Sequence, residues 1–364
     1  MTNKARSPAE LHRDALVIDS HNDTIVMHIR RGNRSVAGTA SGVRHRGTVA
    51  TLCDPLDLAA RGPGVQIDVP KMRSGGIDAG FFAVDVTLAR QNQLAYALDA
   101  FGFFTMECAD SGVDIVRSAG DVRKARDAGR PSAILAIENS DALEGSLNIL
   151  RMFHEIGVRS IGLTHNPRSL AADGNGESRS GGGLTRFGVA LVQEMNRLGV
   201  LVDVSHISER GFWDVIEITD RPIIASHSNC ATLCDHPRNL TDEQIRALAR
   251  NGGTMGVTFV PSFVDASNPT FERLLDHITH AVEVAGAAHV GIGSDFDGGG
   301  TLIEDATAYP AITEGLVRRG FGEQEIRGIL GENHLRVLSS ALKPDSDGSE
   351  ARDEQQNADD DDRG

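Results

Sequence analysis

The chain is 364 residues long, with 40% hydrophobic and 24% charged residues and a formal net charge of −15 at pH 7. This length and composition are ordinary for a soluble globular protein and leave room for one large α/β domain or two smaller ones. The excess of acidic residues argues against nucleic acid or an anionic membrane as a partner, because both carry negative charge themselves.

The start of the chain and its cysteines indicate where the protein works. The start, MTNKARSPAELHRDALVIDS, lacks the apolar segment of a secretion signal, and no apolar run approaches the roughly 20 residues that cross a bilayer. The cysteines are too sparse for a disulfide framework, and the C-x₃-C spacing of Cys230 and Cys234 only weakly indicates a zinc site. We therefore predict a cytoplasmic protein.

The end of the chain differs in composition from the rest. Residues 343–364 lack large apolar side chains and contain the run DDDD, which predicts a disordered acidic tail. A tail that binds a partner is the alternative. Residues 1–342 would then form a single domain.

Short apolar runs recur in chain order, and each predicts a buried strand. They are residues 15–19, 79–86, 132–138, 158–165, 200–206, 222–227, 253–259 and 289–295. Helix-like segments lie between them, the clearest being residues 146–157, 187–199, 241–252 and 270–286. Eight strands that alternate with helices favour a (β/α)₈ barrel. A doubly wound fold should have a glycine-rich phosphate turn after its first strand, where this chain has His-Asn-Asp.

Residues that can bind metals follow six of these strands. They are His21, Asp23, Glu138, His165, His206, His227 and Asp295. In a barrel of this kind the carboxyl ends of the strands converge on one mouth, where active sites are built. A single histidine after a strand is more often structural than a ligand. Potential metal ligands after six separate strands favour a functional cluster.

The stretch VIDSHND places His21 and Asp23 two residues apart. In an extended segment both side chains then point to the same side, into the barrel mouth. A solvated turn is the alternative and would not need this spacing. Asp19 shares the spacing but lies deeper, where we expect it to orient a ligand.

Five candidate ligands exceed the three that one catalytic zinc usually takes from a protein. We predict two zinc ions, or similar divalent first-row ions, with His21 and Asp23 on one. His206 and His227 hold the other, and Glu138 bridges the two ions. Water held between two such ions loses a proton near neutral pH, so a hydroxide that bridges them predicts hydrolysis.

Two further residues are candidates for the chemistry itself. We predict that Asp295 takes the proton from the attacking water and passes it to the leaving group. Asp297 is its competitor, and both acids could instead cap a turn. His165 is predicted to polarise the scissile carbonyl or to hold the developing oxyanion, with a structural histidine as the alternative.

These motifs together resemble the membrane dipeptidase (renal dipeptidase) family of zinc-dependent peptidases. The resemblance covers about residues 11–340 and rests on VIDSHNDT, AIENSDAL, GVRSIGLTHN, GGLTRFG, RLGVLVDVSH, IIASHSN, HPRNLTDEQ and GIGSDFDG. It implies a binuclear zinc barrel that hydrolyses dipeptides, usually as a homodimer. It also implies the same ligand set, with His165 against the substrate and Asp295 as the barrel aspartate.

The resemblance implies one more binding residue. Arg238, in the segment HPRNL, would receive the carboxylate of the dipeptide. A guanidinium group suits this role because it binds a carboxylate through two parallel hydrogen bonds. Without the resemblance, Arg238 would be interpreted as a surface ion-pair residue.

The chain also departs from the family pattern. Asn139 follows the bridging glutamate, where the family often has glycine, and no family role falls on Asp85. The segment 166–183 is closer to microbial than to mammalian members, and we expect it to roof the site. The secretion signal and lipid anchor of the mammalian enzymes are not found, so no membrane association is carried over.

Two alternatives to a dipeptidase stay open. A binuclear hydrolase of the same barrel type could act on N-acyl amino acids, lactones or phosphoesters. A non-catalytic metal-binding barrel with a partner-recruiting tail is the other alternative, although it would be expected to lose some of the chemically competent residues.

Overall fold

The computed structural model describes residues 6–26, 65–89 and 91–341, and the predicted acidic tail lies outside them. Within these residues eight parallel strands close into a barrel in the order β1-β2-β4-β5-β6-β7-β8-β9, with β9 paired back to β1 and β2 paired to β4. The strands are β1 Ile18–Asn22, β2 Ala79–Asp85, β4 Ser132–Glu138, β5 Val158–Gly162, β6 Leu201–Asp203, β7 Ile224–Ser228, β8 Thr254–Val257 and β9 Val290–Ile292. The predicted (β/α)₈ barrel is confirmed.

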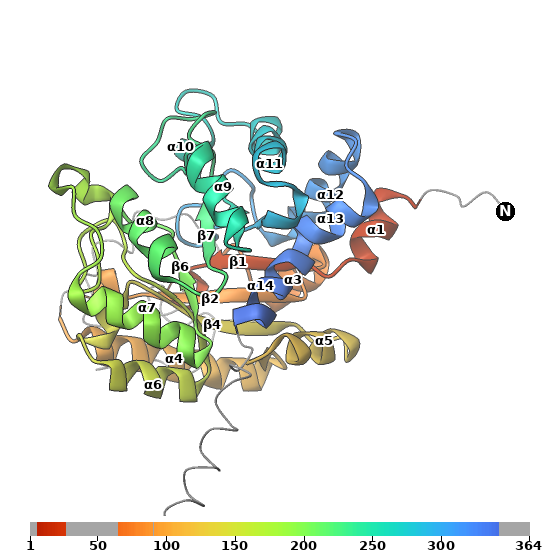
Figure 1. Cartoon of the computed structure of the whole chain (residues 1–364). Coiled ribbons are helices and arrows are strands. Elements are labelled where there is room, and N and C mark those ends of the chain that lie inside the picture. The colour runs from red at the N-terminus through yellow and green to blue at the C-terminus, as the bar shows by residue number, and fades with distance from the viewer. Residues whose placement is uncertain (1–5, 27–64, 90, 342–364) are drawn as a thin grey trace, which may run out of the picture.

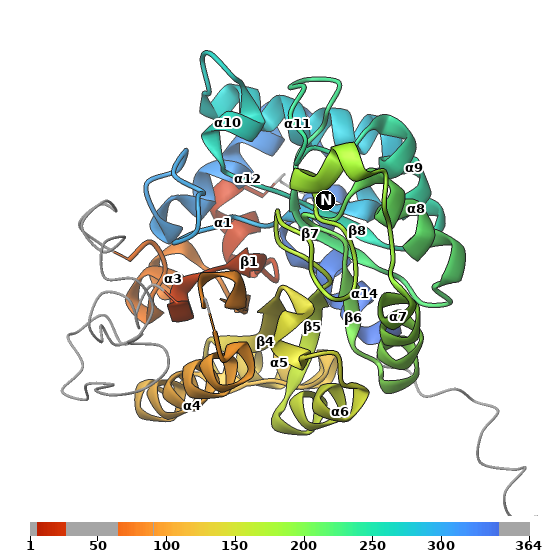
Figure 2. The ribbon, with the colours of Figure 1, turned by 90° about the vertical axis from the view of Figure 1, so that its left-hand side faces the viewer.

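The helices surround the strands. They are α1 Pro8–Asp14, α3 Val69–Gly75, α4 Gln93–Ser111, α5 Ala119–Asp127, α6 Leu147–Ile156, α7 Arg186–Leu198, α8 Glu209–Ile218, α9 Asp242–Arg250, α10 Pro261–Val264, α11 Phe271–Ala285, α12 Tyr309–Arg318, α13 Glu323–Arg327 and α14 Asn333–Ala341. Figure 1 shows α4, α5 and α6 on one side of the strands, with α9, α11 and α12 on the other. Figure 2 looks roughly along the barrel, where the helices form an outer ring.

The four clearest predicted helices are present as α6, α7, α9 and α11. Each begins after a serine or threonine whose side chain accepts a hydrogen bond from a backbone N–H in the first turn. For α7 this residue is Thr185, and the helix ends at Gly199 with φ 76°. Glycine suits that end because the left-handed backbone costs it little.

The predicted strands are present but several are shorter than predicted. For example, β6 ends at Asp203 and β9 ends at Ile292, so His206 and Asp295 lie beyond the sheet. A further strand, β3 Asp114–Ile115, pairs with the start of β4 outside the closed ring. It has only two residues, both partly exposed, so its sequence carries no strand pattern.

Side chains alternate between two apolar clusters along the strands. In β2, Phe81 and Ala83 belong to one cluster, whereas Phe82 and Val84 belong to the larger cluster that contains helix residues such as Phe104. The first cluster joins side chains of several strands, such as Ile134 and Ile224, to residues of α5 and α14. Asp85 has the same parity as Phe81 and Ala83, so the strand delivers it to the interior at its carboxyl end.

Two irregularities interrupt this alternation in the strands that carry predicted site histidines. β1 carries an extra residue between Asp19 and Asn22 relative to β2, and β7 carries one between Ala225 and Ser228 relative to β8. Such bulges change which face the following side chains take. His21 and His227 both lie inside these segments.

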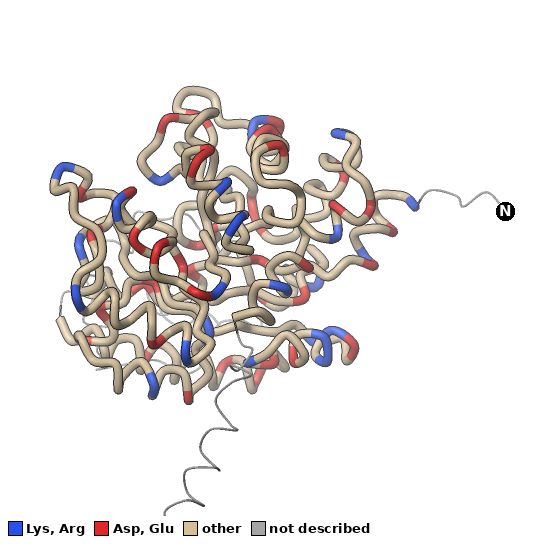
Figure 3. The backbone as a smooth tube through the Cα atoms, in the orientation of Figure 1, with Lys and Arg blue, Asp and Glu red and all other residues tan. Residues whose placement is uncertain are grey.

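Acidic and basic residues are interspersed along the described part of the chain, as Figure 3 shows. Among the described helices, none is both long and apolar enough to cross a membrane.

Gly256 shows how tightly the barrel interior is packed. A Cβ atom at this position in β8 would lie 2.1 Å from the backbone oxygen of Ser226 and 2.4 Å from Oγ of Ser20. The backbone of the neighbouring strand cannot move away without breaking the sheet, so only glycine fits.

Gly256→Ala is therefore expected to destabilise the protein by about 1–3 kcal/mol or to prevent soluble folding. The matched control is Gly102→Ala in α4, where a Cβ meets nothing within 4 Å. Its exposed helical position predicts a gain of about 0.5–1 kcal/mol. Urea unfolding of the metal-loaded variants measures both, and equal effects would contradict the packing argument.

Candidate metal centre

The carboxyl ends of the strands surround a cavity of about 260 Å³. Its lining includes Asp23, Asp85, Glu138, His165, Asn166, His206, Asp295 and Asp297. These residues are far apart in the chain, and the barrel topology brings them to one mouth. Five of them are residues for which the sequence predicts a place in the site, and Asp297 is the predicted competitor of Asp295.

Glu138, at the end of β4, lies at the centre of the cluster. Its Oε1 is 2.9 Å from Nε2 of His206 and 3.6 Å from Nε2 of His227. Its Oε2 is 3.9 Å from Nε2 of His21. The two carboxylate oxygens thus face different histidines, which is the arrangement that a carboxylate bridging two ions needs.

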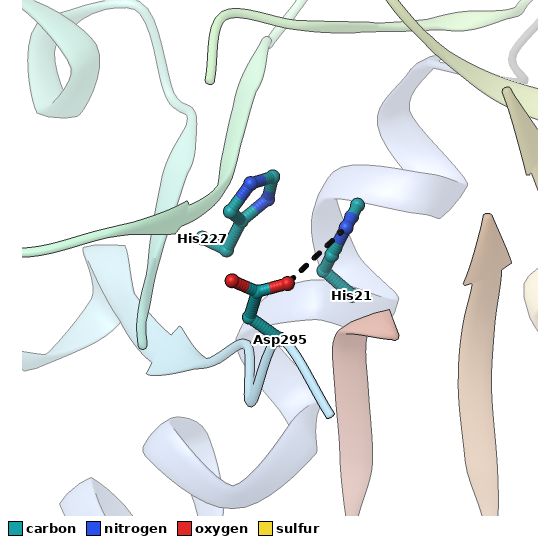
Figure 4. A group of neighbouring side chains, drawn as sticks. All are labelled: His21, His227 and Asp295. Carbon is teal, nitrogen blue, oxygen red and sulfur yellow. Dashed lines mark ion pairs between the residues drawn. The ribbon is translucent and has the colours of Figure 1, made fainter. Parts of the chain in front are cut away.

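The first half of the cluster is formed around His21. Its Nε2 lies 3.8 Å from Oδ2 of Asp23 and 4.0 Å from Oδ1 of Asp295, and the latter pair is drawn in Figure 4. The ring stacks on His227 with centroids 3.8 Å apart. Nε2 is buried and makes no hydrogen bond of ordinary length to a described residue. A buried, unsatisfied imidazole nitrogen facing carboxylates is typical of a metal ligand.

The second half contains His206 and His227, whose Nε2 atoms are 2.8 Å apart. Burial lowers the pKa of both rings well below the usual value, and the neighbouring Arg238 contributes to the effect in each. Both rings are therefore neutral near pH 7. A neutral imidazole has a lone pair with which to bind a divalent ion.

The outer nitrogen of each ring is fixed by a polar neighbour. Nδ1 of His206 lies 2.8 Å from Oδ1 of Asn166, and Nδ1 of His227 lies 2.8 Å from Oγ of Ser226. Ser226 in turn donates to a carboxylate oxygen of Asp203. Each Nδ1 thus donates its proton outward, which leaves the Nε2 lone pairs aimed at Glu138.

The carboxylates crowded in the mouth favour the binding of cations. Burial and the carboxylate of Asp23 raise the pKa of Glu138 well above its usual value and that of Asp295 to about 7. Burial opposes the charged form of His21, but Glu138, Asp23 and Asp295 outweigh it and raise its pKa to about 10. Divalent ions among these groups would offset the repulsion between acids. Imidazole and carboxylate donors fit zinc or a similar first-row ion.

The backbone is strained at the same place. Among the described non-glycine residues with positive φ are His206 at 67°, Asp295 at 58°, Asp297 at 65° and Asn139 at 74°. Such conformations cost free energy and persist where surrounding structure enforces them, often at functional sites. The departure from glycine at Asn139 is thereby explained, because asparagine tolerates positive φ better than most residues.

Asp19 and Asp297 have structural roles here. Asp19 accepts hydrogen bonds from the N–H and the hydroxyl of Ser294 at 2.7 and 2.8 Å, beside Asp295, and contacts no candidate ligand through a hydrogen bond. The expectation that Asp19 orients a ligand from behind stays a prediction, and the hydroxyl of Ser294 also donates to the backbone oxygen of His21 at 3.1 Å. Asp297 accepts from Thr24 and from the backbone of Gln66, each at 2.8 Å.

His165, Asp85 and Arg238 complete the mouth. Nε2 of His165 is 4.0 Å from Oε1 of Glu138, and an atom of Asp85 lies within 4.8 Å of ligand atoms of both. Arg238 is 5% exposed and donates from Nη2 to the backbone oxygen of His227 at 3.0 Å. It is therefore buried beside the cluster rather than paired on the surface.

The segment 166–183 was expected to roof the site, but of its residues only Asn166 lines the cavity. The segment instead braces the turn that carries His206. The N–H of Asn175 donates to the backbone oxygen of His206 at 2.7 Å, and the N–H of Ser208 donates to that of Asp173 at 2.9 Å. Among the described cysteines, Cys230 and Cys234 donate to backbone oxygens and belong to no candidate metal group.

Sequence reasoning missed Asn166 and Ser226 as functional residues. Asn166 follows His165 and Ser226 precedes His227, so their position next to predicted site histidines was the one signal in the sequence. Adjacent residues in an extended strand point to opposite faces, and only the bulges and turns of the structure bring these side chains to the rings.

Comparisons with known proteins show which family the chain resembles. The profile of the family described as membrane dipeptidase (peptidase family M19) matches residues 5–349. A curated relative, the dipeptidase verJ of Clonostachys rogersoniana, is 37% identical over 230 residues, which is 62% of this chain and 59% of that protein. The chain thus matches less than two thirds of that relative's length.

Solved structures are similar over most of the chain. A metallo peptidase from Rhodobacter sphaeroides, liganded with a phosphinate mimic of the dipeptide L-Ala-D-Ala, has a TM-score of 0.74 and 28% identity, covering 90% of this chain and 100% of that one. The dipeptidase AC, a metallo peptidase of family M19, has a TM-score of 0.75 and 29% identity, covering 90% of this chain and 99% of that one.

The contact between Asn166 and His206 can be tested separately. Asn166→Ala removes the acceptor of the Nδ1 proton, so the metal affinity should fall by about 10- to 100-fold. Asn148→Ala, on the surface of α6, is the control and should leave it unchanged. Competition with a chromogenic chelator measures both affinities, and equal values in the two variants would remove Asn166 from the site.

Proposed function

The chain belongs to the membrane dipeptidase family (peptidase family M19), and from this premise we propose that it is a metal-dependent dipeptidase that works with two zinc ions. The observation that carries the proposal is the position of Glu138 between His206, His227 and His21, at 2.9, 3.6 and 3.9 Å. One carboxylate with histidines facing each oxygen suits a pair of ions and is difficult to account for without them.

In this proposal His21 and Asp23 would hold one ion, His206 and His227 would hold the other, and Glu138 would contribute to both. Bound divalent ions would supply an activated water and a Lewis acid for the peptide carbonyl. Other divalent first-row metals fit the same donors. The remaining steps depend on groups of the chain itself.

Asp295 has the environment of a proton carrier. Without ions, burial and Asp23 raise the pKa of its carboxyl to about 7, and bound cations would lower this pKa and keep the group a carboxylate that can accept a proton. Its Oδ1 lies at the edge of the cluster, 4.0 Å from Nε2 of His21. We assign it the transfer of a proton from water to the leaving amine. Asp297 is less suitable, because Thr24 and Gln66 already occupy its oxygens.

His165 and Arg238 would bind the substrate. Burial lowers the pKa of His165, so its neutral ring can donate one hydrogen bond to the scissile carbonyl oxygen. Nε of Arg238 is buried and makes no hydrogen bond to a described residue. The guanidinium, which lies 5.5 Å from the centre of the cavity-lining Phe263 ring, can therefore receive the substrate carboxylate.

The size of the cavity supports a small substrate. Its volume of about 260 Å³ lies below the usual range for sites that bind drug-sized ligands. Cytoplasmic location and homodimer assembly stay predictions from the sequence. Cell fractionation and light scattering would test them.

The function itself is tested by combining metal analysis with a substrate panel. The purified protein should contain about two zinc equivalents and hydrolyse Ala-Ala, and a chelator should remove both. Added zinc should restore turnover. The panel also includes lactones, phosphoesters and N-acyl amino acids, and preference for any of these over dipeptides would contradict the proposal.

Asp295→Asn should retain the metal content of the wild type while kcat falls by about 10²- to 10⁴-fold, because the proton carrier is lost. Asp297→Asn is the contrasting variant, since loss of its bonds to Thr24 and Gln66 should lower thermal stability more than kcat. Steady-state kinetics, elemental analysis and thermal unfolding separate the two. An Asp295→Asn variant with wild-type kcat would exclude the proton transfer.

A further inference from the structure

Asp85 is a buried carboxylate in the mouth for which the proposed mechanism has no use. It is the last residue of β2, is 5% exposed, and lines the same cavity as Glu138 and His165. The register of the sheet pairs Asp85 directly with Glu138 on β4. Burial of a second carboxylate beside the first is costly unless a cation meets it.

The carboxylate of Asp85 is held in place by the turn that follows β2. Oδ1 accepts a hydrogen bond from the N–H of Thr87 at 2.7 Å. The hydroxyl of Thr87 accepts from Nδ2 of Asn139 at 3.0 Å, which ties this turn to the residue after Glu138. The side chain of Thr87 also hydrogen-bonds this carboxylate. Candidate ligand atoms of Glu138 and His165 lie within 4.8 Å of it. The carboxylate is thus oriented by Thr87 and faces the cavity that it lines.

The barrel topology places Asp85 opposite Arg238. Around the ring, β2 and β7 are four strands apart in either direction, and Arg238 is bound to the backbone of His227 on β7. The mouth therefore has a carboxylate that can bind a cation on one side and a guanidinium that can bind an anion on the other. Glu138 lies beside Asp85 on the neighbouring strand, and Arg238 contacts the backbone of His227. A dipeptide with free ends has the same polarity, with an ammonium group, a peptide bond and a carboxylate in order.

We propose that Asp85 binds the α-ammonium group of the substrate, so that the enzyme takes dipeptides with a free amino terminus and discriminates against N-acyl amino acids. The proposal rests on the function proposed above. The ammonium group loses its hydration when it enters the mouth, and the carboxylate of Asp85 replaces that hydration with a charge-assisted hydrogen bond. A neutral acyl group would leave the carboxylate buried without a partner, which a polar site rejects strongly.

The test compares two substrates that differ only in the amino group, Ala-Ala and N-propionyl-alanine. The metal-loaded wild type should prefer Ala-Ala. In Asp85→Asn, kcat/KM for Ala-Ala should fall by about 10- to 100-fold, mainly through KM, while the value for N-propionyl-alanine changes little. The kcat/KM for Ala-Ala divided by that for N-propionyl-alanine should therefore fall by about the same factor. If N-propionyl-alanine is cleaved too slowly, inhibition constants of a phosphinate dipeptide mimic with and without its amino group give the same comparison.

The control variant is Asp78→Asn, just before β2 at its opposite end, where the carboxylate accepts from the N–H of Val17 and pairs with Arg126. It should leave the substrate ratio unchanged. An equal loss on both substrates in Asp85→Asn would overturn the ammonium site and indicate a structural role. A lower metal content in that variant would overturn it in favour of a metal ligand. A wild type that cleaves no dipeptide would overturn the proposed function as well, whereas an unchanged ratio in an active variant overturns only this inference.

Discussion

The carboxylate of Glu138, shared among three imidazoles in a closed mouth, is the constraint on which the rest of the structure depends. It is buried with Asp23, Asp85 and Asp295 close by, and like charges at this density raise one another's pKa values. Folding such a group into a barrel is costly unless cations and hydrogen-bond donors compensate. The barrel is suited to this because its strands all end at one place, and seven of the eight ends contribute polar side chains.

The positions of the ligands depend on local departures from regular structure. His21 and His227 lie in segments where an extra residue interrupts the strand register, and His206 and Asp295 have positive φ. Each departure costs free energy that the closed sheet and its apolar clusters offset. The same departures allow several side chains from short strands to converge, which regular alternation would not permit.

A second set of contacts fixes the orientation of these groups. Asn166 and Ser226 hold the outer nitrogens of two histidines, and Thr87 holds one oxygen of Asp85. With the protons placed outward, the inner nitrogens and oxygens face a common space. On opposite sides of that space stand Arg238 and Asp85, which match the two charged ends of an unblocked dipeptide. In this view the metal centre determines the reaction, whereas these two residues select the substrate.

The sequence by itself determined the barrel and the identity of the clustered residues. Eight apolar runs that alternate with helical segments specify a parallel closed sheet, and residues directly after such runs must lie at its mouth, as the positions of Glu138 and His206 illustrate. Only the tertiary structure decided which way individual side chains point. Asp19 shares the spacing of His21 and Asp23, yet the bulge in β1 directs it to Ser294. Neither the contact of Asn166 with His206 nor the burial of Asp85 and Arg238 could be read from the sequence. Bulges and turns with positive φ depend on pairing between distant segments, which the periodicity of one segment does not encode.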